Sequence, residues 1–221
     1  RLDGFDRALR GRTRDPAFVK GHAIRDSLAA TGVTIQHCRD LIVAFKRDAT
    51  KSRYADWDDL MNYCRYSASP VGRYLLDIHG ESPDGYAASD ALCDALQVIN
   101  HMQDLKDDYL TLDRVYLPQD WMKDEGVVVA DLAAPSASPG LRRVIDRCLD
   151  GTDRLLATAR TLPRRLASRR LAMESAAIIR LAEILSARLR RQDPIARRVA
   201  LSKPASLYHA LVGIGRYWLG R

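Results

Sequence analysis

The stretch Gln97-Val-Ile-Asn100-His-Met-Gln-Asp104-Leu-Lys-Asp-Asp108 decides the fold, because it combines a helical period with oxygen-bearing side chains. At 3.6 residues per turn, four polar residues fall on one stripe of one helix: Gln97, Asn100, Asp104 and Asp108. The residues around them are mostly apolar, and a helix that is apolar nearly all round is usually buried. The sequence therefore predicts a buried helix that carries two amides and two carboxylates in a row.

This stripe has two interpretations. A polar edge on an amphipathic helix faces water and needs no ligand. Two carboxylates one turn apart, however, repel each other when both are ionised, unless a cation lies between them. Oxygen ligands at this spacing suit Mg²⁺, which typically takes one or two carboxylates and completes its shell with water and substrate phosphates. On this second interpretation, Asp104 and Asp108 are the Mg²⁺ ligands.

Helical periodicity extends over most of the chain. Pro70 lies inside one helical pattern and predicts a kink, while Gly151 interrupts another. Ser89 is a good N-cap for the helix that carries the stripe. No stretch alternates with period 2 between turns, so we expect no sheet. The predicted fold class is all-α, a single domain over 1–221 with about eight helices, the clearest of them over 17–30, 34–48, 56–70, 89–109, 141–159, 173–189 and 205–219.

The composition narrows the class of protein. With 221 residues, of which 47% are hydrophobic and 29% charged, the chain is long enough and apolar enough to fold around a core. No window approaches 18 uncharged apolar residues, so we expect no membrane-spanning helix. The four scattered cysteines predict buried free thiols in a reducing cytoplasm. The chain begins with Arg1 rather than Met, so we expect the domain to be incomplete at its N-terminus.

The charge is distributed unevenly along the chain. Residues 141–221 hold 18 Lys and Arg against 6 Asp and Glu, a balance of +12. Residues 1–140 hold 17 against 22, a balance of −5, and the two halves together give the net charge of +7. Such asymmetry indicates either a nucleic-acid face or an anionic membrane face. Because the arginines alternate with apolar residues at helical spacing, we expect no nucleic-acid partner and favour peripheral contact with a membrane.

Several polar residues outside the stripe do not fit a simple amphipathic pattern. Arg53 and Tyr54 follow one predicted helix, Tyr63 lies in the next, and Arg114 comes just after the stripe. Carboxylates that hold Mg²⁺, cationic donors for phosphate oxygens and apolar helical walls together describe a site that ionises an allylic diphosphate. An aromatic face such as that of Tyr63 stabilises positive charge in a substrate.

Several segments of the chain resemble signatures of the squalene/phytoene synthase family. Tyr63-Cys-Arg-Tyr-Ser-Ala-Ser-Pro-Val-Gly72 is similar to its tyrosine-containing signature, and its small residues allow close helix packing. The opening stripe, followed by Arg114-Val-Tyr-Leu-Pro118, is similar to its second aspartate-rich signature. Asp48-Ala-Thr-Lys-Ser-Arg-Tyr54 and Ser89 to Asn100 most resemble the bacterial hopanoid-pathway branch of the family, which forms hydroxysqualene.

The resemblance implies an isoprenoid-synthase helical bundle around a central apolar cavity. It also implies a Mg²⁺-dependent enzyme that converts presqualene diphosphate to hydroxysqualene, cytoplasmic and peripheral to the inner membrane. By this resemblance Tyr63 lies at the cation pocket, and Asp104 and Asp108 bind metal. The residues that meet the diphosphate, directly or through the metal cluster, are Arg53, Tyr54, Gln97, Asn100 and Arg114.

The chain also departs from the family pattern. The family has a first aspartate-rich motif, and no DxxxD of that kind precedes residue 48. Gln103 stands where relatives often have Arg, and Asp113 where many have Gly. Two other hypotheses therefore stay open. One is a phytoene, dehydrosqualene or squalene synthase that acts on farnesyl or related prenyl diphosphates. The other is a non-catalytic helical relative that works as an interaction protein.

Overall fold

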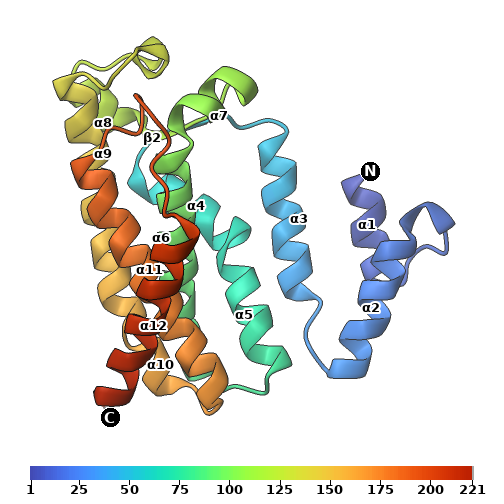
Figure 1. Cartoon of the computed structure of the whole chain (residues 1–221). Helices are drawn as coiled ribbons and strands as arrows, with labels where there is room; N and C mark the ends of the chain where they lie inside the picture. The colour runs from blue at the N-terminus through green and yellow to red at the C-terminus, as the bar shows by residue number, and fades with distance from the viewer. Residues whose placement is uncertain (221) are drawn as a thin grey trace.

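Helices form almost the whole structure, a computed structural model that describes residues 1–220 (Figure 1). The predicted all-α class is confirmed. Besides three short 3₁₀ helices, those residues form twelve α-helices rather than about eight, because two predicted helices are broken and several segments are short. They are α1 (Leu2–Leu9), α2 (Val19–Thr31), α3 (Gln36–Asp48), α4 (Trp57–Ser67), α5 (Ser69–Ile78), α6 (Tyr86–Gln103), α7 (Leu105–Leu112), α8 (Gln119–Asp124), α9 (Pro139–Ala159), α10 (Leu162–Arg165), α11 (Arg169–Arg191) and α12 (Lys203–Leu219).

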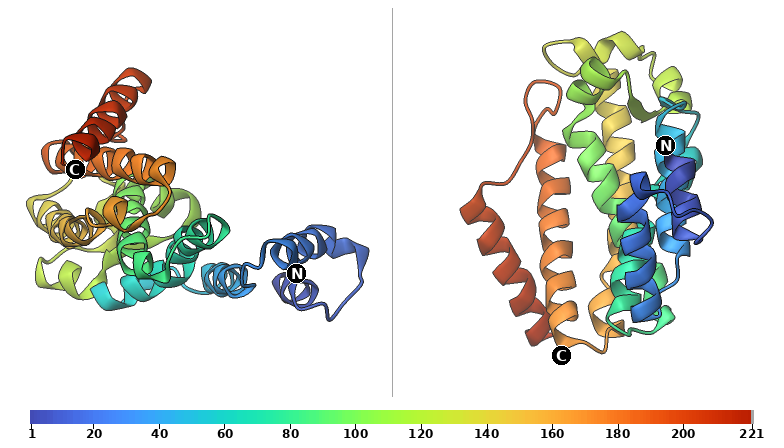
Figure 2. Two further views of the ribbon diagram at one scale, coloured as in Figure 1. Left: turned by 90° about the horizontal axis from the view of Figure 1, so that it is seen from below. Right: turned by 90° about the vertical axis from the view of Figure 1, so that its right-hand side faces the viewer.

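The helix α6 lies at the centre of the bundle and packs against α4, α5, α9 and α11. Its side chains from Ala95 to Met102 include the most deeply buried of the core, as the apolar pattern around the stripe predicts. Figure 2 shows that the first three helices extend from one side of this core and that α12 lies on the opposite side, outside α11.

Local sequence explains where several helices begin and end. Asp56 caps α4 by accepting a hydrogen bond from the backbone N–H of Asp59. Gly32 ends α2 at a positive φ of 72°, a conformation that favours glycine. The prediction that Ser89 caps α6 is wrong, because that helix begins at Tyr86 and Ser89 is buried inside it. Gly151 does not interrupt α9 either, since it lies within the helix against the ring of Trp57.

Two helix breaks shape the region around the stripe. Ala68 has a non-helical conformation and separates α4 from α5, so that Pro70 falls in the first turn of α5, where a missing N–H costs nothing. The predicted kink at Pro70 is therefore a break between two helices. Asp104 separates α6 from α7, so that of the two carboxylates of the stripe Asp104 lies at the junction and Asp108 on α7.

A short parallel sheet corrects the expectation that the chain has no strands. The strands β1 (Arg53–Tyr54) and β2 (Val115–Pro118) pair with an irregular register, Arg53 opposite Val115 and Tyr54 opposite Pro118. With two and four residues, they are too short for a period-2 pattern to show in the sequence.

An apolar groove of about 200 Å³ lies between α5, α6 and α11. Leu92 and Leu96 of α6 and Ile178 of α11 contribute to its lining, and Val71 and Leu75 of α5 are partly exposed along it. Two further apolar pockets, of about 280 and 240 Å³, border α2 and α3, so the apolar space of the described chain is divided among several pockets. No helix within residues 1–220 combines the length and the apolar character needed to cross a membrane.

The contact between α11 and α12 gives a stability prediction. A Cβ atom on Gly213 would lie 2.6 Å from the backbone O of Ala176, whereas one on Gly215 would meet nothing within 4 Å. We expect Gly213→Ala to lower the free energy of unfolding by roughly 1–3 kcal/mol, because the backbones must separate. Gly215→Ala is the matched control and should raise it slightly, by up to about 1 kcal/mol. Urea unfolding measures both, and equal effects would contradict the close packing.

Candidate functional site

The small sheet joins two segments that lie about sixty residues apart in the sequence. The backbone N–H of Val115 donates to the O of Ser52 over 2.9 Å, and that of Asp120 donates to the O of Ala55 over 3.0 Å. All four residues of β2 are buried, which fixes the pair against the core. The sheet therefore brings the segments that hold Arg53, Tyr54 and Arg114 together, and α4 packs against both of its strands.

Four rings form a buried cluster at this end of the bundle. Tyr54 stacks on Tyr116 with centroids 5.6 Å apart and is tilted against Tyr63 at 5.4 Å. The ring of His101 also stacks on Tyr116, with centroids 3.4 Å apart. Burial raises the pKa of Tyr63 and of Tyr54 far above the usual range, so both hydroxyls stay protonated. The cluster presents aromatic surface without a positive charge of its own.

His101 is a site residue that the sequence reasoning missed. Burial, and next the charge of Arg114, lower the pKa of His101 to about 3, so that its ring is neutral at pH 7. Its Nε2 lies 3.2 Å from Nε2 of Gln97, and a neutral ring accepts the amide hydrogen there. The pair orients the amide of Gln97. Periodicity gave no indication of this role, because a lone histidine in an apolar pattern resembles any buried residue.

Asp48, at the end of α3, connects Tyr63 with Arg114. The Tyr63 hydroxyl donates to Asp48 Oδ1 over 2.9 Å, and Arg114 Nη2 donates to the backbone O of Asp48 over 2.8 Å. Arg114 Nη1 also lies 3.8 Å from Asp48 Oδ1. Sequence reasoning included Asp48 only as the first residue of a polar loop, since its partners come from other parts of the chain.

The two predicted metal ligands differ in their surroundings. Asp104 forms a two-pronged ion pair with Arg198, whose Nε donates over 2.7 Å and whose Nη2 donates over 3.3 Å. Asp108 is half-buried, and burial, followed by the charge of Asp104, raises its pKa. Asn100, one turn before Asp104, is exposed. Arg198 was not predicted, because nothing in the sequence links it to a residue 94 positions earlier.

Arg53, predicted to bind phosphate, is held by Asp113 in this structure. Its Nη2 donates to Asp113 Oδ1 over 2.5 Å, and its Nη1 donates to the backbone O of the same residue. Asp113 has a positive φ of 50°, the left-handed conformation that favours glycine and that aspartate tolerates better than most residues. The chain thus makes a left-handed turn at Asp113, whose side chain also pairs with Arg53.

The carboxylates of Asp104 and Asp108 could supply part of the ligand shell of a Mg²⁺ ion. Within residues 1–220 no group of three or more His, Cys, Asp or Glu side chains is arranged to hold a metal. Mg²⁺, however, takes as few as one or two carboxylates when phosphate and water supply the other ligands. Burial, and next the charge of Asp104, raise the pKa of Asp108, and a cation beside the two carboxylates would favour the ionised form of both. Asp104 and Asp108 are therefore compatible with such an ion.

The hydrogen bond of Tyr63 gives a second prediction. Tyr63→Phe should lower the free energy of unfolding by about 1–2 kcal/mol, because Asp48 loses a buried donor. Tyr54→Phe is the matched control, since the Tyr54 hydroxyl makes no hydrogen bond to a described residue, and it should cost less. Thermal or urea unfolding of the two variants tests this. A larger loss for Tyr54→Phe would contradict the role of Asp48 as the acceptor.

Comparison with known proteins assigns the chain to a family. The family model for squalene/phytoene synthase matches residues 1–205. The hydroxysqualene synthase of Rhodopseudomonas palustris is 43% identical over 190 residues, which are 86% of this chain and 65% of that protein. The hydroxysqualene synthase of Zymomonas mobilis is 44% identical over 191 residues, 86% of this chain and 64% of that protein. The chain thus spans just under two thirds of the length of these curated relatives.

Solved structures are similar as well. The crystal structure of the squalene synthase HpnC from Alicyclobacillus acidocaldarius is 37% identical, with a TM-score of 0.76 over 86% of this chain and 73% of that one. A dehydrosqualene synthase, solved in complex with a ligand, superposes with a TM-score of 0.80 over 100% of this chain and 77% of that one. At 16% identity, this match shows only that the two proteins share a fold. The chain belongs to the squalene/phytoene synthase family, as its signatures predict.

Proposed function

We propose that this protein is a Mg²⁺-dependent head-to-head isoprenoid synthase that converts presqualene diphosphate and water to hydroxysqualene and diphosphate, as part of hopanoid biosynthesis. The observation that carries the proposal is the joint position of Tyr63, Arg114 and the Asp104/Asp108 pair at one end of α6. Such a combination suits a substrate with an anionic diphosphate and a large apolar body. The hydroxysqualene synthases that match this chain support the same product.

The polar residues of the site would receive the diphosphate. Arg114 stands beside Asp108 and adds positive charge next to the two carboxylates of the stripe. Arg53 would exchange its exposed partner Asp113 for a phosphate oxygen, a stronger acceptor for a guanidinium fork. Asp104 and Asp108 would hold Mg²⁺, with Gln97 and Asn100 on the same stripe. When bound, the metal supplies charge neutralisation for the departing diphosphate.

The aromatic cluster would face the positive charge that remains on the hydrocarbon. The electron-rich face of a tyrosine such as Tyr63 stabilises a cation. Because His101 is neutral, the cluster adds no repulsion to that cation. The apolar groove beside α6 would take part of the hydrocarbon and limit access of water. In the final step, one water molecule adds to the cation and loses a proton, which gives the alcohol.

The location of the protein belongs to the same proposal. Substrate and product each carry a C30 hydrocarbon chain that partitions into lipid, and the basic half of the chain suits an anionic surface. We therefore propose a cytoplasmic protein that is peripheral to the inner membrane. No nucleic-acid partner is proposed.

Product analysis tests the activity. Protein expressed from its complete coding sequence should convert presqualene diphosphate to hydroxysqualene in the presence of Mg²⁺, as measured by gas chromatography and mass spectrometry. Asp104→Asn and Asp108→Asn should each lower the rate roughly 100-fold or more, because the leaving diphosphate loses its countercharge. The matched control is Asp107→Asn, an exposed carboxylate next to the stripe, which should retain the rate.

Three results would contradict the proposal. Formation of a hydrocarbon rather than an alcohol would favour a squalene, dehydrosqualene or phytoene synthase. The absence of any C30 product from folded protein would favour a non-catalytic interaction protein. Equal rates for Asp104→Asn and Asp107→Asn would show that the stripe does not take part in the reaction.

The ion pair of Asp104 gives a separate prediction on metal binding. Arg198 neutralises Asp104 in this structure, so Arg198→Ala should strengthen binding of Mn²⁺, used as a spectroscopic substitute for Mg²⁺. Arg197→Ala removes an exposed neighbouring charge and is the matched control. Electron paramagnetic resonance of free Mn²⁺ measures both affinities. The assignment of Asp104 is contradicted if Arg198→Ala and Arg197→Ala change the affinity equally, or if Asp104→Asn has no effect.

A further inference from the structure

The last helix, α12, is attached to the bundle along one side only. Gly213 and Tyr217 are its buried residues, and both belong to the side that meets α11. The close approach at Gly213, described above, allows the two backbones to touch. Figure 2 shows α12 outside α11, at the edge of the molecule. The match to the family model ends at residue 205, so that almost all of α12 lies beyond it.

The side of α12 that no residue among 1–220 covers is apolar. Its large exposed side chains are between 48% and 90% accessible: Leu207, Tyr208, Leu211, Trp218 and Leu219. At 100° per residue these five residues occupy an arc of about 120°, and only Pro204 and Gly215 share it with them. The arc contains no charged residue. A continuous apolar face of this kind on a protein surface marks an interaction site rather than scattered surface residues.

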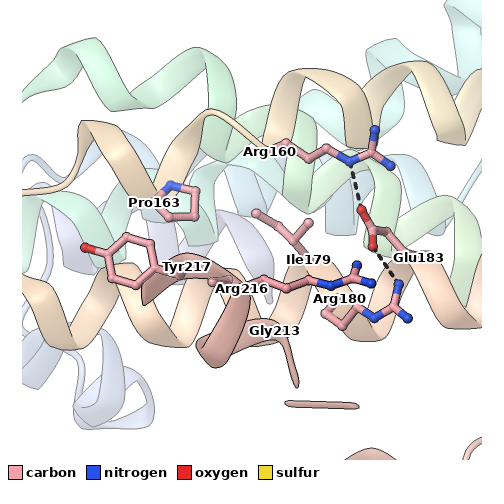
Figure 3. Close-up of a pocket in the computed structure, with 9 residues that line it drawn as sticks. Arg160, Pro163, Ile179, Arg180, Glu183, Gly213, Arg216 and Tyr217 are labelled. Atoms are coloured by element: carbon pink, nitrogen blue, oxygen red, sulfur yellow. Dashed lines mark hydrogen bonds and ion pairs between the residues drawn. The ribbon is translucent and has the colours of Figure 1, made fainter. Parts of the chain in front are cut away.

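Arginine side chains lie along one flank of this apolar face. Arg160, Arg180 and Arg216 surround a pocket of about 260 Å³ between α11 and α12, shown in Figure 3. The only carboxylate of its lining is Glu183, which accepts from Arg160 Nε over 2.8 Å and from Arg180 Nη1 over 3.1 Å. Arg216 forms no ion pair with any residue that the structure describes, and the buried Nε of Arg180 has no hydrogen-bond partner there. Three guanidinium groups against one carboxylate leave two positive charges.

We propose that α12 is the surface by which this protein docks on an anionic membrane. The apolar face lies in the boundary between headgroups and acyl chains, and the arginines of the pocket meet lipid phosphate. Trp218 and Tyr208 are the residue types that prefer this boundary, because each combines an apolar ring with a polar group. Helices with one apolar and one basic side bind in this way, through buried apolar area and attraction to anionic lipids.

A second copy of the chain fits this face less well. A symmetric dimer places the same patch on both sides of the interface. The flanks of α12 carry Lys203 and Arg216 and no acidic residue, so that two copies would bring like charges together. An anionic bilayer supplies the opposite charge at the same edges. Charge complementarity therefore selects the membrane.

This surface refines the membrane contact of the proposed function, and its test does not use the enzymatic reaction. Wild-type protein should sediment with vesicles of phosphatidylcholine and phosphatidylglycerol, and less with phosphatidylcholine alone or at high salt. Leu211→Glu should weaken binding roughly tenfold, since it puts a charge into the apolar face. Arg216→Glu should weaken it at least about fivefold, on the anionic vesicles only.

Two matched controls carry the same changes far from α12. Val19→Glu replaces an exposed apolar residue of α2, and Arg14→Glu reverses an exposed charge near it; both should bind as wild type does. Circular dichroism confirms that each variant is folded. Leu211→Glu should also keep its activity on substrate dispersed in detergent, which separates a failure of docking from a failure of the proposed reaction.

The proposal is overturned by any of three results. Wild-type protein that does not bind anionic vesicles excludes the docking surface. Leu211→Glu and Val19→Glu that bind equally well move the contact elsewhere. A wild-type dimer in sedimentation analysis that Leu211→Glu dissociates, without vesicle binding by either protein, assigns the face to a second copy.

Discussion

The parallel pairing of β1 with β2 is the contact on which the candidate site depends. Two short strands hold Arg53 next to Val115, although about sixty residues separate them in the chain. Bringing such distant segments together has an entropic cost, which the complete burial of β2 in the core offsets. Tyr54, Arg114 and Tyr116 then take their places around α6. Without this pairing, the polar residues would lie on separate loops.

Ion pairs hold the charged residues of the site at rest. Arg198 pairs with Asp104, Asp113 with Arg53, and Asp48 with Arg114. Asp48, Arg53, Asp104 and Arg114 are partly buried, and an unpaired charge in such a position is costly, whereas their partners Asp113 and Arg198 are exposed. A diphosphate with its metal would change the partners rather than create interactions from nothing, so the free energy of binding would be a difference between two sets of pairs. The neutral His101 contributes differently, since it orients Gln97 without adding charge.

The two exposed surfaces with a proposed role are set apart in the fold. The polar residues gather around the ends of α3, α4 and α6, whereas α12 lies on the outer side of α11. The apolar groove beside α6 also reaches α11, through Leu171 and Ile178. The long helix α11 contacts both α6 and α12.

The sequence by itself determined the all-α class, most helix positions and the polar stripe of α6, because helical period and burial are local properties of neighbouring residues. The break at Asp104 and the cap of α6 at Gly85 instead of Ser89 required the structure, since tertiary packing overrides weak local preferences. The strands were too short to leave a pattern. Asp48 and Arg198 joined the site only in three dimensions, because the atoms they contact come from segments that no sequence spacing connects to them. His101 lies one helical turn from Gln97, but its stacking on Tyr116 joins two separate segments and also required the structure.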